Sequence, residues 1–161
     1  MDRIRVIGLD PGLRNLGFGI IDLAGSKLSH VAHGVFTTDQ TFEMPVRLKR
    51  LFEGLCGIIE SFAPDEVAIE TTFVNRNAAS SLKLGQARGI ALLAPAMRGL
   101  SVAEYAPNEI KKSIVGVGHA EKPQIHHMVK RLLPNTEITS SDAADALATA
   151  ICHAHHRTRR F

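Results

Sequence analysis

Four acidic side chains stand at positions where carboxylates could meet. Asp10 ends one short apolar run and Glu70 ends another. Asp142 and Asp145 are three residues apart in a helix-like segment, which places them on one face about 5 to 6 Å apart at Cβ. Carboxylates that are close together and partly buried are costly unless a cation takes the charge. The four acids therefore raise the question of a metal site.

The chemistry of such a cluster is that of hard oxygen ligands. If the two strands are adjacent and the helix begins beside them, all four acids converge. Carboxylates without added Cys or His favour Mg²⁺ or Mn²⁺, which keep water and bind phosphate oxygens. Two such ions about 3.5 to 4 Å apart would activate a water and stabilise the leaving oxygen of a phosphodiester. This pattern predicts a nuclease.

Each acidic signal taken alone also has a simpler explanation. Asp10 precedes Pro11 and Gly12 and could open an Asx-type turn. Asp142 and Asp145 could favour the start of a helix through its macrodipole, with Ser141 as its cap. These alternatives stay open for each motif by itself. The combination of three separate acidic signals favours the metal site.

The elements that would position these acids begin with three strands. Apolar runs and turn residues predict strands over residues 4–10, 16–23 and 27–37, an antiparallel meander with a tight turn at residues 24–26. A further strand is predicted over residues 66–70.

The longest apolar periodicity between Asp10 and Glu70 predicts a helix. From Pro45 to Phe62 apolar residues recur at steps of three and four, which is typical of an amphipathic helix. The pattern places Arg47, Lys49 and Arg50 on its outer face. We expect a solvent-exposed basic side on this helix.

The second half of the chain predicts one strand among several helices. Residues 78–97 are apolar around the whole circumference, so this helix should be deeply buried or packed on another subunit, with Pro95 kinking or ending it. A strand over residues 100–105 follows. Three more helices are predicted, over residues 108–115, 121–133 and 142–155. Strands that alternate with helices indicate a mixed α/β sheet with helices on its faces.

Composition limits the class of protein. A chain of 161 residues with 45% hydrophobic content fits a single domain over residues 1–161. We expect a cytoplasmic protein that makes no membrane contact, since the sequence has no long apolar span and its N-terminus no signal-peptide pattern. Cys56 and Cys152 lack metal-type spacing and are predicted to be buried thiols.

The charge distribution suits a polyanionic partner. The chain has 19 Lys and Arg against 16 Asp and Glu, with a pI near 9.1. If four acids gather in one site, 12 remain against the 19 basic residues elsewhere. A mildly basic surface is common, so charge alone decides little. A basic, His- and Arg-rich tail from about residue 154 is expected to be frayed and to attract DNA.

A glycine loop in the second half superficially resembles a phosphate loop. Gly116 and Gly118 precede Lys122, but the loop follows a helix and lacks the Gly-Lys-Ser/Thr ending, so we exclude ATP binding. His119, His126 and His127 are expected to be ordinary surface or helix histidines. Of these, only His119 is considered close enough to Lys122 for a phosphate contact.

Five motifs, in order over residues 4–153, closely resemble the bacterial Holliday junction resolvase family RuvC. They are Gly8-Leu9-Asp10-Pro11-Gly12, Ala68-Ile69-Glu70, Leu82-Lys83-Leu84-Gly85-Gln86-Ala87-Arg88-Gly89, the Gly116 loop with Ala120-Glu121-Lys122, and Asp142-Ala143-Ala144-Asp145-Ala146-Leu147-Ala148. The resemblance implies an RNase H-like fold, with a three-strand antiparallel meander, parallel strands, and helices on both faces. It also implies a homodimer that makes Mg²⁺-dependent paired nicks in four-way DNA junctions, with RuvA and RuvB as partners.

The resemblance also assigns roles to individual residues. It implies that the four acids, Asp10, Glu70, Asp142 and Asp145, are catalytic metal ligands. Phe73 matches an aromatic that contacts bases at the crossover, although from its sequence context alone its ring could fold back over the sheet edge. The basic residues expected to contact DNA are Arg76, Lys83, Arg88, Lys111 and Lys122, of which the last two match family positions that serve binding and cleavage.

A few positions depart from the family. Thr71 and Thr72 replace residues that the family often has between the glutamate and the aromatic, so sequence preference is open. Pro95 lies in the helix that the family uses for dimerisation. Pro123 should start a helix directly after Lys122.

Three other classes of protein share some of the features that indicate a junction-resolving nuclease. An ATPase domain of the sugar-kinase or actin type also begins with a strand-end Asp, but it needs a second lobe for which the chain is too short. A junction-binding module without catalysis would not need four acids. Another small RNase H-like nuclease with a different substrate is harder to exclude, because acids indicate the reaction better than the substrate. We expect hydrolysis to give 5′-phosphate products, with two Mg²⁺ per site and Mn²⁺ as a substitute.

Overall fold

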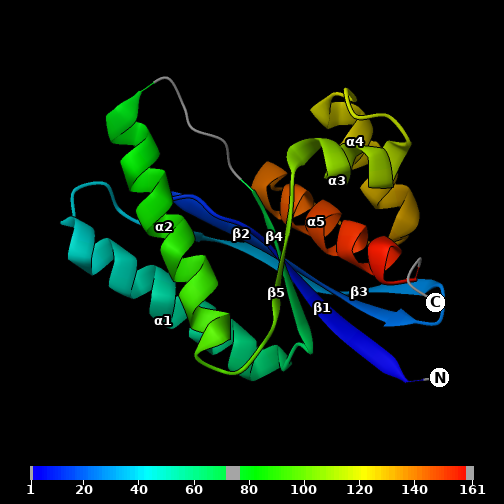
Figure 1. Cartoon of the computed structure of the whole chain (residues 1–161), viewed down its shortest axis with the longest axis horizontal. Coiled ribbons are helices and arrows are strands. Elements are labelled where there is room, and N and C mark those ends of the chain that lie inside the picture. Colours follow the sequence, from blue (N-terminus) through cyan, green and yellow to red (C-terminus); the bar gives the residue numbers. More distant parts are fainter. Residues whose placement is uncertain (1, 72–76, 159–161) are drawn as a thin grey trace.

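The computed structural model describes residues 2–71 and 77–158 (Figure 1). Five strands and five helices are formed by these described residues. In chain order they are β1 (Arg3–Asp10), β2 (Asn15–Ala24), β3 (Lys27–Thr37), α1 (Met44–Phe62), β4 (Glu66–Glu70), α2 (Ala78–Ala96), β5 (Val102–Tyr105), α3 (Pro107–Val115), α4 (Lys122–Leu132) and α5 (Ser141–Thr158).

The strands form one mixed sheet in the order β3-β2-β1-β4-β5. β1, β2 and β3 are joined antiparallel, whereas β4 pairs parallel with β1 and β5 parallel with β4. The predicted meander followed by parallel strands is therefore confirmed. The parallel pairings require the chain to cross back over the sheet, and α1 and α2 make those connections.

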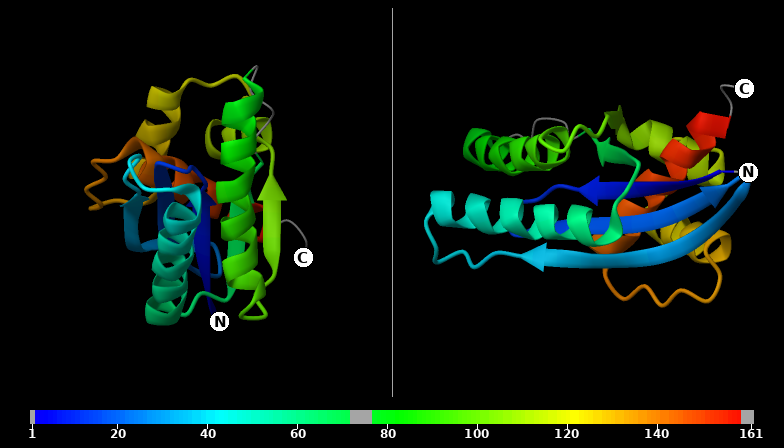
Figure 2. Two further views of the ribbon diagram at one scale, coloured as in Figure 1. Left: turned by 90° about the vertical axis from the view of Figure 1, so that its left-hand side faces the viewer. Right: turned by 90° about the horizontal axis from the view of Figure 1, so that it is seen from below.

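Helices cover both faces of the sheet because alternate strand residues point to opposite sides. On one face Val6 packs in a cluster with the apolar residues of α3, α4 and α5. On the other face Ile7 and Leu9 pack against α1 and α2. Figure 1 and Figure 2 show the α1 and α2 pair separated from the α3 to α5 group by the sheet. Helices on both faces, predicted from the sequence, are confirmed.

Glycines in the central strands allow α5 to lie directly on the sheet. A Cβ added to Gly8 in β1 would lie 2.1 Å from the carbonyl oxygen of Ala146. A Cβ added to Gly17 in β2 would lie 2.3 Å from the carbonyl oxygen of Asp142. Only glycine permits such an approach of two backbones. The first turn of α5 is thereby held against the end of the sheet where β1 finishes.

Two predictions about α1 are wrong. Arg47 was expected on its outer face, but it is 8% exposed and its Nε donates a hydrogen bond to Oγ1 of Thr38 at 3.1 Å. The segment after β3 folds back over this part of the helix, which the helical periodicity by itself does not reveal. Cys56 is only partly buried, whereas Cys152 is buried as predicted.

The expected fraying near the C-terminus is wrong for the residues up to Arg157. α5 continues to Thr158, beyond the predicted end at residue 155. Its last turns are fastened to β4, since Nε2 of His153 lies 2.6 Å from Oε2 of Glu66 and Nε of Arg157 donates to Oε1 of Glu66 at 2.9 Å. A carboxylate from a distant strand thus holds what looked like a charged tail.

The helix α2 ends one residue after Pro95, in agreement with the prediction that this proline would end or kink it. The helix is buried on one side and exposed to solvent on the other. Ala87 and Ala91 are buried in the sheet-facing cluster, while Leu82, Leu93 and Met97 are 66%, 49% and 66% exposed. No helix among the described residues has the length and apolar character to cross a membrane.

Candidate functional site

Asp10 and Glu70 lie side by side at one edge of the sheet. They end β1 and β4, which are parallel and in a register that pairs Leu9 with Ile69. Because the carboxyl ends of adjacent parallel strands meet, the two acids that follow this pair are brought together. Both are only partly exposed, since the strands before them are buried.

The start of α5 brings the other two acids to the same edge. Oγ of Ser140 accepts a hydrogen bond from the backbone N–H of Ala143 at 3.3 Å. The helix therefore starts one residue earlier than predicted, and Ser140 rather than Ser141 supplies the hydroxyl at its start. Asp142 lies over Gly17 of β2, and Asp145 follows one turn later.

The electrostatics show that the four acids have converged. Burial, and after it the charges of Asp145, Glu70 and Asp142, raise the pKa of Asp10 to about 7, against the opposing charge of Lys122. Burial and the charge of Asp145 also raise the pKa of Glu70, against the effect of Lys122 and Lys111. A carboxylate whose pKa rises in this way is short of positive charge. The cluster is suited to binding a cation.

Two residues of α4 contact Asp145. Nζ of Lys122 donates to Oδ2 at 2.9 Å, and Nε2 of His126 lies 2.9 Å from Oδ1. The hydrogen bond to Asp145 raises the pKa of Lys122. Both oxygens of this carboxylate therefore have a partner from one helix.

His126 is a site residue that the sequence reasoning missed, since it was expected to be an ordinary helix histidine. The signal was present in its spacing. His126 follows Lys122 by four residues, and residues four apart lie on the same side of a helix. A helix that directs Lys122 toward the acids must direct His126 there as well.

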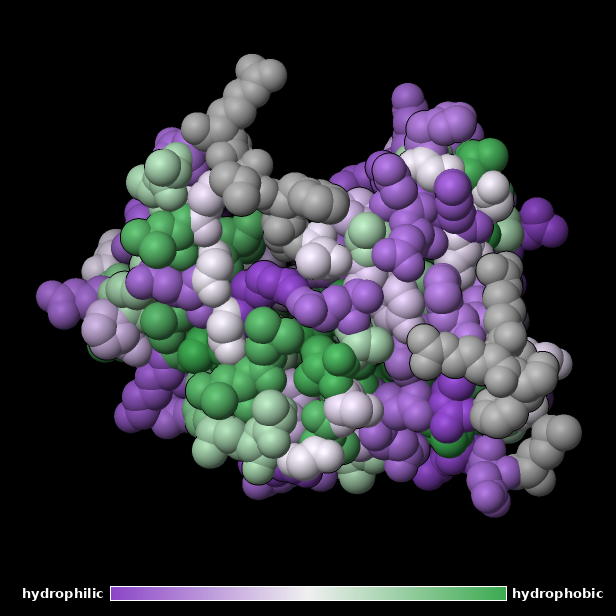
Figure 3. Space-filling model, in the orientation of Figure 1, coloured by the Kyte–Doolittle hydropathy of each residue, from purple (hydrophilic) through white to green (hydrophobic). Residues whose placement is uncertain are grey.

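The acids open into a cavity of about 310 Å³ between α2 and the helices α3 to α5. The space-filling view is hollowed between α2 and the α3–α4 pair (Figure 3). The cavity is lined by Asp10, Pro11, Glu70, Thr71, Leu84, Pro107, Ile110, Lys111, Lys122, Ile125, Asp145 and Ala148. It brings together three of the four acids and two of the predicted basic residues. Asp142 lies close enough to Asp10 to raise its pKa but is not part of this lining.

The donor set fits a divalent metal ion, but the present side-chain positions do not yet form its ligand shell. Among the residues that the structure describes, no three His, Cys, Asp or Glu side chains are arranged to hold an ion. The acids nevertheless raise one another's pKa values, and oxygen donors of this kind suit Mg²⁺ or Mn²⁺. Lys122 and His126 now occupy the oxygens of Asp145 that such an ion would require. An ion held by Asp145 would therefore have to displace at least one of them, and Lys122 is the more exposed.

The other residues predicted to contact DNA differ in their exposure and in the partners they already have. Lys83 is exposed on α2, and Lys111 lies at the rim of the cavity. Arg88 is already engaged, because it donates to the carbonyl oxygen of Glu70 at 3.2 Å and pairs with Glu104. This arrangement makes Arg88 a support for the end of β4. Phe73 and Arg76 lie outside the described residues.

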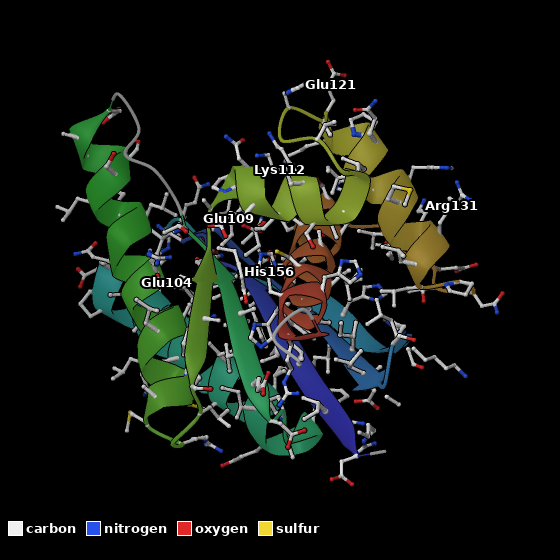
Figure 4. All side chains as sticks on the ribbon, turned by 45° about the vertical axis from the view of Figure 1, so that its right-hand side comes forward. Glu104, Glu109, Lys112, Glu121, Arg131 and His156 are labelled. Carbon is white, nitrogen blue, oxygen red and sulfur yellow. The ribbon has the colours of Figure 1, made fainter. Side chains whose placement is uncertain are left out.

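Other charged side chains surround the site without entering it. Figure 4 shows Lys112 on α3, Glu121 at the start of α4 and Arg131 on α4, pointing away from the sheet. Figure 3 likewise shows hydrophilic residues gathered over α3 and α4. The polar surface therefore continues outward from the cavity over these two helices.

Comparison with known proteins gives consistent results. The profile of the family described as "Crossover junction endodeoxyribonuclease RuvC" matches residues 6–153. Proteins of that name from Rhizobium rhizogenes and Brucella ovis are 57% and 56% identical to the chain. The first alignment covers 96% of this chain and 91% of the relative, and the second 97% and 90%.

A solved structure is also similar over nearly the whole chain. It is described as "T. thermophilus RuvC in complex with Holliday junction substrate" and has a TM-score of 0.92 at 31% identity. The match covers 98% of this chain and 96% of that one. This similarity confirms the RNase H-like fold that the motifs had implied.

Proposed function

The chain belongs to the RuvC family of crossover junction endodeoxyribonucleases, and on that premise we propose the chemistry by which it resolves four-way (Holliday) DNA junctions. The observation that supports the proposal is the convergence of Asp10, Glu70, Asp142 and Asp145 at one edge of the sheet. These acids come from two strand ends and one helix start, and no packing requirement explains why all four should be acidic.

In this proposal the four acids hold two Mg²⁺ ions, and Mn²⁺ substitutes for them. The chemistry that such ions supply when bound is the activation of a water and the stabilisation of the leaving oxygen. Asp10 would be the acid best placed to contribute to both ion sites, because it lies on the central strand and its pKa responds to the charges of all three other acids. Attack of water on the phosphorus atom would break its bond to the 3′ oxygen and leave a 5′-phosphate and a 3′-hydroxyl, so that the nicks can be ligated.

Basic residues of α3 and α4 position the DNA backbone. Lys111 and Lys122 line the cavity beside the acids, where a scissile phosphate would enter. A phosphate at this place competes with Asp145 for the ammonium group of Lys122. Release of Asp145 by Lys122 then frees a carboxylate oxygen at the moment when DNA arrives. His126 keeps the other oxygen of Asp145 oriented.

We also propose a homodimer in which each subunit cuts one of two like strands. Leu82 and Leu93 on α2 and Met97 at its C-terminal cap are exposed at spacings of 11 and 4 residues, which places them along one side of the helix. Exposed apolar side chains in such a row favour a protein partner. Sedimentation should give a dimer for the parent protein and a monomer for the Leu93→Lys variant. A parent protein that sediments as a monomer would contradict this assignment.

RuvA and RuvB are proposed as the branch-migration partners on the basis of family membership. This part of the proposal has a separate test from the chemistry. Purified RuvA and RuvB added to the protein on a mobile junction should change the position or the rate of resolution.

The decisive experiment compares a mobile four-way junction with a linear duplex of the same sequence. Symmetric nicks confined to the junction are expected with Mg²⁺, and none in excess chelator. Asp10→Asn should abolish cleavage while junction binding persists. Preferential cutting of the duplex, or cutting that is undiminished in chelator, would overturn the proposal.

A further inference from the structure

A second cavity shares Leu84 with the cavity at the acids. Its volume is about 430 Å³, and we call it the basic pocket. It is lined by Leu13, Arg14, Gln40, Arg47, Ser80, Lys83 and Leu84. Three of these residues are cationic, and no acidic residue is among the described residues that form the lining. The acid cluster and the basic pocket thus have opposite charge and share one lining side chain.

Four separate segments contribute to the basic pocket. Arg14 lies in the turn between β1 and β2, and Gln40 follows β3. Arg47 comes from the first turns of α1, and Lys83 from the N-terminal part of α2. Cations from separate elements repel one another, so an anion bound in this cavity would stabilise their arrangement.

Arg47 gives the basic pocket a fixed centre. Its side chain is almost fully buried, and Nε is held by Oγ1 of Thr38, which itself donates to the carbonyl oxygen of Leu13 at 2.5 Å. No ion pair involves Arg47 among the described residues. Its one hydrogen bond among these residues comes from Nε, its charge helps to lower the pKa of Asp39, and its side chain lines the pocket. A guanidinium group fixed in this way suits bidentate recognition of a phosphate.

The basic pocket and the catalytic acids are connected through the chain and through space. Leu84 lines both cavities. Leu13 and Arg14 come directly after the Asp10-Pro11-Gly12 turn. A DNA strand that places one phosphate at Asp10 would therefore have a neighbouring phosphate at the basic pocket.

We propose that the basic pocket binds a backbone phosphate of the cleaved DNA strand, one or two nucleotides from the scissile bond. Arg14, Arg47 and Lys83 are its positioning residues, and they fix which phosphodiester reaches the acids. This inference rests on the proposed function, since it names a further contact of the same substrate. Of the three residues, only Lys83 was predicted from the sequence to contact DNA.

The competing explanation is that Arg47 serves only to tie α1 to the segment after β3. That role would affect folding but not the salt dependence of DNA binding. The test therefore leaves Arg47 intact and changes the two exposed cations, as Arg14→Gln with Lys83→Gln. The matched control is Lys27→Gln with Lys49→Gln, which removes the same charge from exposed positions outside both cavities.

Equilibrium binding of a four-way junction is measured in chelator at several salt concentrations. For the pocket variant we expect the dissociation constant to rise about tenfold, the weaker end of what a charge-assisted hydrogen bond contributes. The slope of the logarithm of affinity against the logarithm of salt should fall by about 1, the effect of losing one phosphate contact. The control should keep the parent slope. A pocket variant with the parent slope and affinity would overturn the inference.

A second measurement locates the phosphate. Single methylphosphonate linkages, which lack the charge, are moved along the cleaved strand. One linkage within two nucleotides of the scissile bond should weaken binding by the parent protein more than binding by the pocket variant, which keeps only Arg47 of the three cations. The effects of the two changes are then not additive. A penalty that is equal in both proteins at every position would contradict the assignment.

The two proposals fail in different ways. If the parent protein does not cut the junction in Mg²⁺, the proposed function fails. If the parent cuts normally, but the pocket variant has the parent's junction affinity and the parent's loss of affinity at each methylphosphonate, only the basic pocket is refuted.

Discussion

Nζ of Lys122 lies 2.9 Å from Oδ2 of Asp145, so a lysine of α4 neutralises one of the acids at the end of the sheet. The lysine is largely exposed, whereas the aspartate is mostly buried. The ammonium group can therefore leave toward solvent or DNA more easily than the carboxylate can move. This pair places a built-in cation where the proposed ions would bind.

Lys122→Gln should tighten Mg²⁺ binding in the absence of DNA and slow junction cleavage. The ammonium group competes with the metal for Asp145, so its removal should lower the dissociation constant for Mg²⁺ about threefold to tenfold, the effect of a contact of roughly 1 kcal/mol. Titration calorimetry measures this change. Lys130→Gln removes an exposed charge from the same helix and is the control. An unchanged or weaker Mg²⁺ affinity in Lys122→Gln would show that the lysine does not compete.

Asp10 should make the metal-free protein less stable as the pH rises. Its pKa is about 7 in the folded chain against 3.8 in an ordinary carboxyl, because burial and then the charges of Asp145, Glu70 and Asp142 raise it. The folded state thus holds a proton that the unfolded state has lost between these values. The stability that Asp10 contributes is fully present below about pH 4, decreases as the pH rises from 4 to 7, and is lost above about pH 7.

Asp10→Asn should remove this dependence. In chelator the variant should be more stable than the parent at pH 8 by roughly 1 to 4 kcal/mol, and nearly equal to it at pH 4. Urea unfolding at the two pH values measures the difference. Equal stabilities at pH 8 would mean that neither burial nor the neighbouring acids destabilise ionised Asp10 in the folded chain.

Gly17→Ala should destabilise the protein and lower cleavage together. The added Cβ would lie 2.3 Å from the carbonyl oxygen of Asp142, which is backbone and cannot rotate away. Forcing α5 away from the sheet should cost about 1 to 3 kcal/mol. Gly57→Ala is the control, since a Cβ there meets nothing within 4 Å and should stabilise α1 by up to about 1 kcal/mol. Thermal unfolding and junction cleavage test both variants, and a Gly17→Ala protein of parental stability would contradict the close packing.

Arg157→Ala should destabilise the fold although it lies near the C-terminus. Burial raises the pKa of Glu66, but the hydrogen bonds from His153 and Arg157 lower it more, which leaves it below its usual value. Removing the partially exposed Arg157 should cost about 1 kcal/mol, measured by urea unfolding. Arg131→Ala on α4 should cost less, because Arg131 points away from the sheet (Figure 4). If Arg157→Ala leaves the free energy of unfolding unchanged, the segment is a frayed tail, as its composition suggests.

Local patterns in the sequence were enough to predict the strands and helices and to single out the four acids. Apolar runs that end in Asp10 and Glu70 mark strand ends, and three-residue spacing marks Asp142 and Asp145 as neighbours on a helix. These signals depend only on the period of a strand or helix. The predicted strands and helices accordingly agree with the structure to within a few residues at their ends.

Contacts between distant segments were decided only by the tertiary structure. The chain by itself could not show that Arg47 turns inward to Thr38, or that Glu66 fastens the last turns of α5. Each of these joins residues from different elements, so its energy depends on how whole helices pack on the sheet. The sequence by itself determined which side chains could bind metal and DNA. Packing of α4 and α5 on the sheet decided which cations the acids meet, because burial and distance set the strength of every charge interaction.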